Sequence, residues 1–423
     1  MPLSFWSKSK GKKAQSPVPE MDTLFAQFPT PASSSTKIRL SILSTAMVDA
    51  LGGPAEFQQR FSFPFVSSML PNDTFKLPPG VWTDDTSMTL CLAKSLCTFK
   101  ESPNSPYTGG FDEVHQLQLY KRWHEEGHLS AVGRCFDIGN GIRTALDLFN
   151  EYEEDPEQAL LRIRCDLSDE SKSGNGSLMR ITPIGLAYWR DNSEAKVYAR
   201  RSSQATHPSA MCLEVCEMWT GAIGLIMKEA TQPPKDLSKP NEGRFSKLCL
   251  LEYISNYPYA NNKLRESLAL PFGVPPRPER TAERENWYFR YHPLLRLIAE
   301  TQSPAAVAAR SEPSFSYNIP TAEQLPSSGF VLHSAVAALY CFFSTQTFED
   351  GALMAVNLGN DADTVGAIYA GLAGCWYAAE EGKAEGLFWT KRVKGWKQSL
   401  VRRSMVEEIA ESLVVLERKL AEE

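Results

Sequence analysis

Apolar residues recur at helical spacing in three stretches of the chain, and each stretch predicts a helix packed against others. Residues 38–51 carry an apolar stripe that ends at Gly52-Gly53-Pro54, where a left-handed glycine followed by proline is typical of a helix stop. Residues 87–99 are mostly apolar, and residues 365–377 mix large apolar side chains with glycine and alanine. Because small residues let helices approach one another closely, we expect the last of these helices to be central and buried.

The pattern outside these stretches divides the chain into a leader and one domain. Residues 1–36 are rich in Ser, Pro and Lys and predict a disordered leader. Residues 37–423 predict a single domain, in which residues 231–328 are Pro-rich and irregular. We interpret this irregular stretch as an insertion that helps to shape a cleft. Residues 388–423 predict one or two amphipathic helices.

Composition supports a helical core and narrows the classes of function. The chain has 423 residues, 43% of them hydrophobic, which is ample for a core. Its net charge of -6 gives no reason to expect nucleic-acid binding through a basic surface, and we find no apolar run of membrane-spanning length. Nine scattered Cys without a Cys-x-x-Cys motif are typical of reduced thiols. We expect an intracellular, cytoplasmic protein; a lysine cluster at residues 8–13 leaves nuclear targeting open.

Two acidic runs stand directly ahead of predicted helices, at Thr83-Asp84-Asp85-Thr86 and Asp361-Ala362-Asp363-Thr364. An Asp or Thr at a helix start has an alternative role as a cap for unpaired backbone N–H groups. Capping uses one oxygen, however, and each run brings two carboxylates and at least one hydroxyl. Carboxylates packed together raise the pKa of one another unless a cation neutralises them. The two runs therefore predict the halves of one Mg²⁺ or Mn²⁺ site, in which four Asp side chains bridge two ions.

A further acid and a glycine-bearing loop accompany these runs. Glu56 follows the stop of the first helix and is either a ligand or general base over the site or a solvated loop acid. Asp49, near the end of that helix, has the alternative of bonding to neighbouring backbone. Residues 173–180 contain Gly174-Asn175-Gly176-Ser177, whose backbone N–H groups suit a phosphate or diphosphate, although most such sequences are simple turns.

Together these segments resemble the ADP-ribosylglycohydrolase family, including its dinitrogen-reductase-activating branch. The resemblance runs from about Ile38 to about Tyr377 in chain order. Its segments are residues 48–52 with Glu56, residues 82–86, Asp137-Ile138-Gly139-Asn140 with Arg143, residues 174–180, Thr206-His207-Pro208 and residues 357–367, together with Gly329-Phe330-Val331.

The resemblance implies an all-α, compact orthogonal helical fold with a dinuclear Mg²⁺ or Mn²⁺ centre at the base of a cleft. The implied metal ligands are Thr83, Asp84, Asp85, Asp361, Asp363 and Thr364. The implied substrate-binding residues are Ser173, Gly174, Asn175, Gly176, Ser177 and Met179 for the diphosphate, with His207, Gly329 and Phe330 toward the nucleoside. The implied catalytic residues are Glu56, Asp85 and Asp137, and the resemblance places Asp137 beside the scissile bond.

The chemistry so implied is hydrolysis of the glycosidic bond between ADP-ribose and an acceptor on a protein or small molecule. Such hydrolysis needs a positioned water, an acid for the leaving group and a fixed sugar. The aspartate at 137 favours an arginine acceptor, with serine-linked or small-molecule acceptors left open. A non-catalytic ADP-ribose-binding relative is the alternative, and the intact set of Asp84, Asp85, Asp361 and Asp363 argues against it. Which acid handles the proton, and the oligomeric state, do not follow from the sequence.

Three features depart from these patterns or compete with them. Asn360 stands where relatives commonly carry glycine, and Leu178 stands where a small residue is common. Both spare the implied ligands and are expected to alter substrate fit. His124 and His128 form an i, i+4 pair, but the absence of an accompanying Cys or carboxylate pattern argues against a zinc site there.

Overall fold

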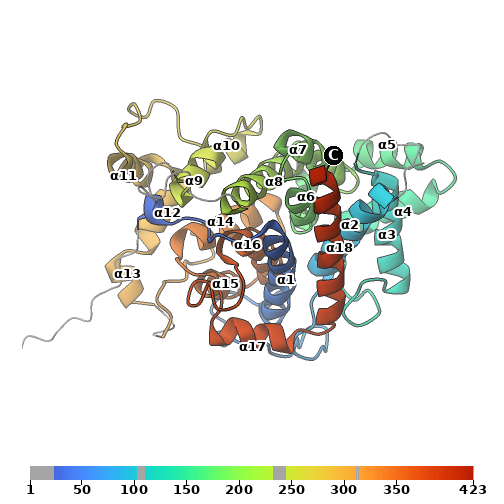
Figure 1. Cartoon of the computed structure of the whole chain (residues 1–423), viewed down its shortest axis with the longest axis horizontal. Helices are drawn as coiled ribbons and strands as arrows, with labels where there is room; N and C mark the ends of the chain where they lie inside the picture. Colours follow the sequence, from blue (N-terminus) through green and yellow to red (C-terminus); the bar gives the residue numbers. More distant parts are fainter. Residues whose placement is uncertain (1–22, 102–109, 232–243, 311, 313, 423) are drawn as a thin grey trace, which may run out of the picture.

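Helix α16 (Ala362–Tyr377) lies at the centre of the molecule, with every one of its residues buried. Its glycines explain how other helices approach it. A Cβ at Gly374 would lie 2.8 Å from the Cα of Ser41, and a Cβ at Gly366 would lie 2.9 Å from Val48, both on α1 (Ser34–Gly52). A Cβ at Gly371 would meet the Thr182 hydroxyl at 2.4 Å. Figure 1 shows α1 and α16 in the middle of the molecule, where they pack against each other. The prediction of a central, buried helix is confirmed.

This computed structural model describes residues 23–101, 110–231, 244–310, 312 and 314–422, with no account of the side chains of residues 99–101. These residues form α-helices, short 3-10 helices and isolated bridges, without a strand. The all-α prediction is therefore confirmed. The helices beyond α1 and α16 that surround the site are α2 (Asp84–Glu101), α3 (Glu113–Glu126), α4 (Asn140–Glu151), α5 (Pro156–Asp166), α6 (Thr182–Ala187), α7 (Asn192–Gln204), α8 (Ala210–Thr231), α14 (Val331–Ser344) and α15 (Phe348–Val356).

The predicted leader, residues 1–36, overlaps described residues that begin at Thr23. Ser33 caps α1, accepting from the backbone N–H of Thr36. Upstream, the backbone N–H groups of Leu24 and Phe25 donate to the Glu285 carboxylate at 2.9 and 3.1 Å, and Leu24 is buried. A buried side chain and a carboxylate acceptor therefore hold the last part of the predicted leader against the domain. Residues 1–22 lie outside the described residues, and the division into leader and domain stays a prediction.

The stop of α1 does not use a left-handed glycine. Gly52 and Gly53 both have right-handed φ angles, -76° and -50°, and residues 53–55 continue as a 3-10 turn. Glycine is required at 52 for another reason: a Cβ there would lie 2.5 Å from the Cα of Asp363. The prediction of a left-handed cap was wrong, and the residue instead admits the backbone of the second acidic run.

The Pro-rich stretch is more helical than its sequence predicts. It contains α9 (Lys247–Ser255), α10 (Asn262–Leu268), α11 (Thr281–Tyr291), α12 (Pro293–Thr301) and α13 (Pro304–Ala308). Pro293 and Pro304 stand at helix starts, where proline is tolerated because its missing N–H has no intrahelical partner. Residues 232–243 of this stretch lie outside the description, and its origin as an insertion stays a prediction.

The C-terminal prediction of amphipathic helices is confirmed by α17 (Lys391–Ser399) and α18 (Arg403–Glu422). Both pack against α1, and Figure 1 shows α18 running along the front of the molecule. Apolar residues of α18 such as Val406, Leu413 and Val414 are buried. Helix α18 thus closes the core beside α1 and α2.

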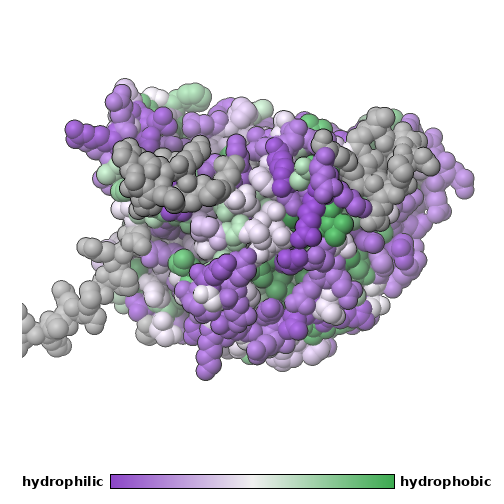
Figure 2. Space-filling model, in the orientation of Figure 1, coloured by the Kyte–Doolittle hydropathy of each residue, from purple (hydrophilic) through white to green (hydrophobic). Residues whose placement is uncertain are grey.

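One described helix, α8, is long and apolar enough to cross a membrane by length and composition, contrary to our reading of the sequence. Its most apolar window is 78% buried inside the protein, against α7, α6 and α16. The core helix of a protein can have the same length and composition, so this observation is weak evidence for a membrane span. Figure 2 shows that the visible face is mainly hydrophilic, with smaller hydrophobic areas between.

Candidate metal and ADP-ribose site

Asp49 of α1 caps helix α2 from a different helix. Its carboxylate accepts from the backbone N–H groups of Thr83 and Thr86 at 3.0 Å each, and from their hydroxyls at 3.0 and 2.5 Å. Asp49 does bond to backbone, as one reading of the sequence allowed, but to a segment more than thirty residues away. It therefore fixes the start of α2, where Asp84 and Asp85 follow.

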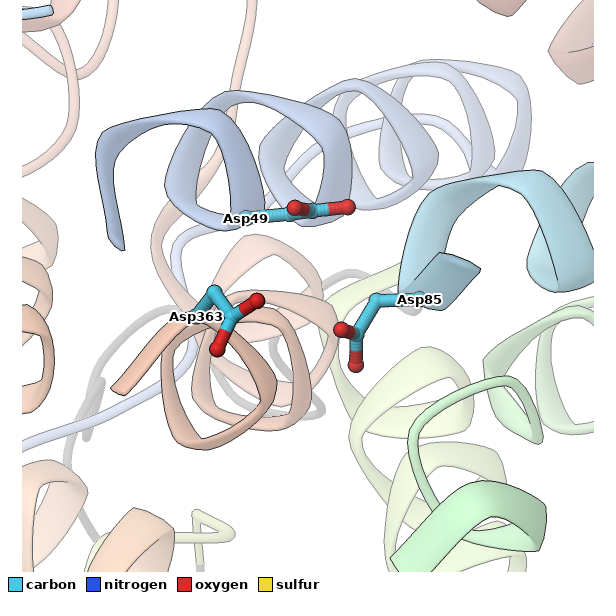
Figure 3. Close-up of side chains that lie close together, drawn as sticks. All are labelled: Asp49, Asp85 and Asp363. Atoms are coloured by element: carbon cyan, nitrogen blue, oxygen red, sulfur yellow. The ribbon is translucent and has the colours of Figure 1, made fainter. Parts of the chain in front are cut away.

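Asp49, Asp85 and Asp363 converge from three helices, α1, α2 and α16 (Figure 3). One carboxylate oxygen of each lies within 4.8 Å of the others, and all three residues are buried. The hydroxyl oxygens of Thr83 and Thr364 lie 3.1 and 3.2 Å from Asp85 Oδ2. Both acidic runs therefore meet, as their carboxylates and hydroxyls predicted, with Asp49 beside them.

A second group of acids adjoins the first through Asp363. Oxygens of Glu56, Asp137 and Asp363 also lie within 4.8 Å of one another. Glu56 follows the turn after α1 and is only 2% exposed, so it is not a solvated loop acid. The predicted catalytic residues Glu56 and Asp137 thus lie together, and Asp85 belongs to the adjoining group.

The electrostatics of these acids favour a cation. Burial raises the pKa of Asp84, Asp85 and Asp363 well above its usual range, and neighbouring carboxylates raise it further. Burial also raises the pKa of Asp49 and of Asp361 to about 6, and that of Glu56 and Asp137 above the ordinary value. Like charges so close together in a low dielectric cannot all ionise without compensation.

Three orphaned oxygens test whether these residues fit a metal. Oδ1 of Asp85, Oδ1 of Asp363 and Oε2 of Glu56 are buried without a hydrogen-bond partner among the described residues. A buried acceptor without a partner is costly, and carboxylate oxygens are the ligands that hard divalent cations prefer. The donor set therefore fits a divalent metal. Asp49 is a poorer ligand, because both of its oxygens already accept hydrogen bonds.

Above the acids lies a cleft of about 730 Å³, within the range of small-molecule sites. The predicted residues that line it are Glu56, Asp84, Asp137, Gly174, Asn175, Gly176, Met179, His207, Gly329, Asp361 and Thr364. The predicted residues Ser173, Ser177, Phe330, Thr83, Asp85 and Asp363 are not part of the lining. Ser177 and Ser173 instead bond to Ser203 and Ser209, so their hydroxyls support the loop rather than face the cleft.

The glycine loop is joined to the second acidic run by one side chain. The Asn175 amide donates to Asp361 Oδ2 at 2.5 Å and to the Ser334 hydroxyl at 2.9 Å. Its backbone N–H donates to the carbonyl of Gly329 at 3.0 Å, beside an isolated bridge between Gly174 and Phe330. The loop is thus held against the second acidic run by hydrogen bonds, and its role in binding phosphate stays a prediction.

His207 packs against three glycines that also line the cleft. A Cβ at Gly141, Gly174 or Gly176 would lie 3.0, 3.3 or 2.8 Å from the His207 ring. Burial lowers the pKa of His207 to about 3, so the imidazole is neutral. Glycine at these positions leaves room for the ring and for a ligand against the loop backbone.

Arg180 is a residue whose role the sequence did not reveal. It is fully buried and donates to the Gly176 carbonyl at 2.6 Å, the Ser202 carbonyl at 3.1 Å and the Thr206 hydroxyl at 2.7 Å. Thr206 Oγ1 also bonds His207 Nδ1 at 2.8 Å. Since arginine only donates, the Thr206 hydrogen is available to Nδ1, which favours the tautomer with its proton on Nε2. The one feature of the sequence that could have indicated this role is the position of Arg180 at the end of the glycine loop, residues 173–180.

The two departures from the resemblance have different consequences. Asn360 lines the cleft with a left-handed φ of 56°, a conformation that asparagine tolerates better than most residues. Leu178 is 1% exposed and contributes to the core. Only Asn360 is placed to affect substrate fit.

Comparison with known proteins agrees with this geometry. The family model described as ADP-ribosylglycohydrolase matches residues 30–422. The ADP-ribosylarginine hydrolase Tri1 of Serratia proteamaculans is 27% identical over 390 residues, covering 90% of this chain and 80% of the relative. The ADP-ribosyl-[dinitrogen reductase] glycohydrolase of Rhodospirillum rubrum is 22% identical, covering 81% and 85% of the two chains. The human ADP-ribosylhydrolase ARH3 is 22% identical, covering 75% and 76%.

A solved structure titled "ADP-ribosylglycohydrolase-related protein complex" matches with a TM-score of 0.55 and 27% identity, covering 91% of this chain and 99% of that chain. The fold and the sequence comparison therefore extend over nearly the whole chain. On these grounds the chain belongs to the ADP-ribosylglycohydrolase family of glycosidic-bond hydrolases.

Proposed function

We propose that this protein hydrolyses the N-glycosidic bond between ADP-ribose and an arginine side chain, using two Mg²⁺ or Mn²⁺ ions. The observation that carries the proposal is the grouping of Glu56, Asp137 and Asp363, with oxygens within 4.8 Å of one another beside a cleft whose wall is the glycine loop. The similarity to two bacterial proteins named ADP-ribosylarginine hydrolase supports the arginine acceptor. The ARH3 relatives support a hydrolase of ADP-ribosyl bonds without deciding that acceptor.

The residues proposed to hold the ions are the two acidic runs. Thr83, Asp84 and Asp85 lie at the start of α2, and Asp361, Asp363 and Thr364 lie at the start of α16. Bound divalent ions would neutralise these carboxylates, chelate sugar hydroxyls and lower the pKa of a bound water. Asp49 supports the set by fixing Thr83 and Thr86.

The rest of the cleft is proposed to bind and orient ADP-ribose. Gly174 and Gly176 line the cleft. The N–H of Gly174 already donates to the carbonyl of Lys172 at 2.9 Å, so the N–H of Gly176 is the one proposed to receive the diphosphate. The Nε2–H of neutral His207 offers a further donor at the same end. Asn175 holds this loop in register with Asp361, so the sugar-binding and diphosphate-binding parts are fixed relative to each other.

Glu56 and Asp137 are proposed to manage the proton. Two carboxyl groups this close share a proton, which leaves one as an acid and the other as a base. The acid protonates the departing guanidine nitrogen, and the base takes a proton from the attacking water. Both residues line the cleft.

The proposal is tested by incubating the purified protein with Mg²⁺ or Mn²⁺ and arginine-linked, serine-linked and free ADP-ribosyl substrates, with EDTA as control. Metal-dependent release of ADP-ribose from the arginine-linked substrate is the expected result. Release from the serine-linked substrate alone would refute the proposed acceptor. ADP-ribose binding without release from any substrate, under either metal, would favour the non-catalytic alternative.

A further inference from the structure

Phe57 is an exposed aromatic residue placed directly beside the proposed acid pair. It follows Glu56 in the chain, lines the cleft and is 61% exposed. Its φ is +59°, in the left-handed region that a bulky residue rarely adopts. An apolar ring held in a costly conformation and open to water calls for an explanation, and such positions cluster at ligand sites.

Hydrogen bonds hold Phe57 in this conformation. Its N–H donates to the Asn360 carbonyl at 2.6 Å, and the Asn360 N–H donates to the Gln58 carbonyl at 2.7 Å. Nearby, the buried Arg60 donates to the carbonyls of Leu358, Pro320 and Leu325. The loop that carries Phe57 is therefore anchored to the segment before the second acidic run.

The Phe57 ring begins a row of aromatic side chains that follows the acids. Phe57 and Phe75 have ring centroids 6.2 Å apart, and Phe75 and Phe136 have centroids 5.4 Å apart. Phe57 and Phe136 are the chain neighbours of Glu56 and Asp137, whose oxygens lie within 4.8 Å. At the far end of the row the guanidinium of Arg134 lies over the Phe136 ring, 6.0 Å from its centroid.

The charge of the cleft favours a cationic group at this end. With Asp84 and Asp361 assigned to the metal ions, the lining still offers Glu56 and Asp137 to an acceptor, and Lys172 is the one Lys or Arg among the described lining residues. An aromatic face beside carboxylates suits a planar cation, because the ring attracts the charge through its face while the carboxylates accept the N–H groups at its edge. An ammonium or a neutral hydroxyl would bind less favourably between an aromatic ring and carboxylates, because neither is a planar cation with several N–H donors at its edge.

We propose that Phe57 determines acceptor specificity: its ring receives the guanidinium of the arginine leaving group, whose N–H groups face Glu56 and Asp137. This inference rests on the proposed function, since it names the residue that selects the acceptor at the same site. Phe57 binds and orients the acceptor and takes no part in proton transfer.

The test compares Phe57→Leu and Phe57→Tyr with the wild-type protein. Phe57→Leu keeps an apolar side chain on the same backbone but removes the aromatic ring. Phe57→Tyr keeps the aromatic ring. Phe61→Leu is the matched control, because Phe61 is 52% exposed, has a φ of +64° and does not line the cleft. Calorimetry measures the binding of agmatine, a small guanidinium compound, to each protein saturated with ADP-ribose, and the binding of ADP-ribose alone.

We expect Phe57→Leu to weaken agmatine binding about five- to tenfold, as loss of a cation–π contact predicts, with ADP-ribose binding unchanged. Phe57→Tyr and Phe61→Leu should bind agmatine like the wild-type protein. Wild-type protein that does not bind agmatine, equal agmatine binding by Phe57→Leu, or an equal loss of ADP-ribose binding would each overturn the inference. Because binding is the readout, a failure to hydrolyse arginine-linked substrate would count against the proposed function separately.

Discussion

The side-chain amide of Asn175 donates a hydrogen bond to Asp361 Oδ2 at 2.5 Å, joining the glycine loop to the second acidic run. The two residues are 186 positions apart in the chain. A carboxylate oriented by such a donor is a better ligand than a free one, since outer partners hold the ligand in place. This bond links the part of the cleft proposed for diphosphate to the part proposed for metal.

Asn175→Ala is therefore expected to weaken Mn²⁺ binding by about tenfold, because Asp361 loses its donor. Calorimetric titration of Mn²⁺ into metal-free protein measures the change. Asn140→Ala is the control, since Asn140 also lines the cleft but its exposed side chain forms no hydrogen bond with the described acids. Equal weakening in both variants would mean that Asn175 acts through the general shape of the cleft.

Gly52→Ala is expected to destabilise the fold by about 1–3 kcal/mol, because the new methyl would lie 2.5 Å from the Asp363 backbone. Urea unfolding of the metal-free protein measures this free energy. Gly395→Ala on α17 is the opposite control: nothing lies within 4 Å of a Cβ there, so it should stabilise by about 0.5–1 kcal/mol. Equal effects of the two substitutions would contradict the close contact of α1 with α16.

His207 is expected to make stability fall with acid. Burial lowers the pKa of His207 from 6.5 to about 3, so between these values the unfolded chain binds more protons than the folded protein. Stability is full above pH 6.5 and is lost toward pH 3, by at most about 1.4 kcal/mol per pH unit. His207→Asn should reduce this slope, measured by urea unfolding between pH 7 and 5.

The carboxylate cluster titrates in both proteins, so the difference between their slopes isolates His207. His292 is also buried, with its pKa lowered to about 4, and His292→Asn should reduce the slope in the same direction. Identical slopes for wild-type protein and His207→Asn would show that this histidine is not neutral and buried.

The central helix and the meeting of the acidic runs could be predicted from the sequence. The small residues of α16 and the Asp residues at the starts of α2 and α16 form local patterns. Each pattern can be recognised from residues that are neighbours in the chain. The glycine loop was predictable for the same reason, because its residues are adjacent in the chain.

Other features depend on contacts between distant segments and could not be predicted. Asp49 caps α2 and Arg180 holds Gly176 against Thr206, and neither partner can be identified from the spacing of residues. The helices of the Pro-rich stretch were missed because prolines at helix starts resemble breaks in the pattern. Whether an oxygen faces the cleft or supports it, as for Ser177, depends on tertiary packing.

The measurement that tests the central claim most directly is a calorimetric titration of Mn²⁺ into EDTA-treated protein. We expect two bound ions per chain in the wild-type protein and loss of binding in Asp85→Asn and Asp363→Asn, whose orphaned oxygens lie in the cluster. Circular dichroism of both variants would verify that they remain folded. Absence of Mn²⁺ binding by the wild-type protein, or unchanged binding by both folded variants, would contradict a metal centre built from these acids.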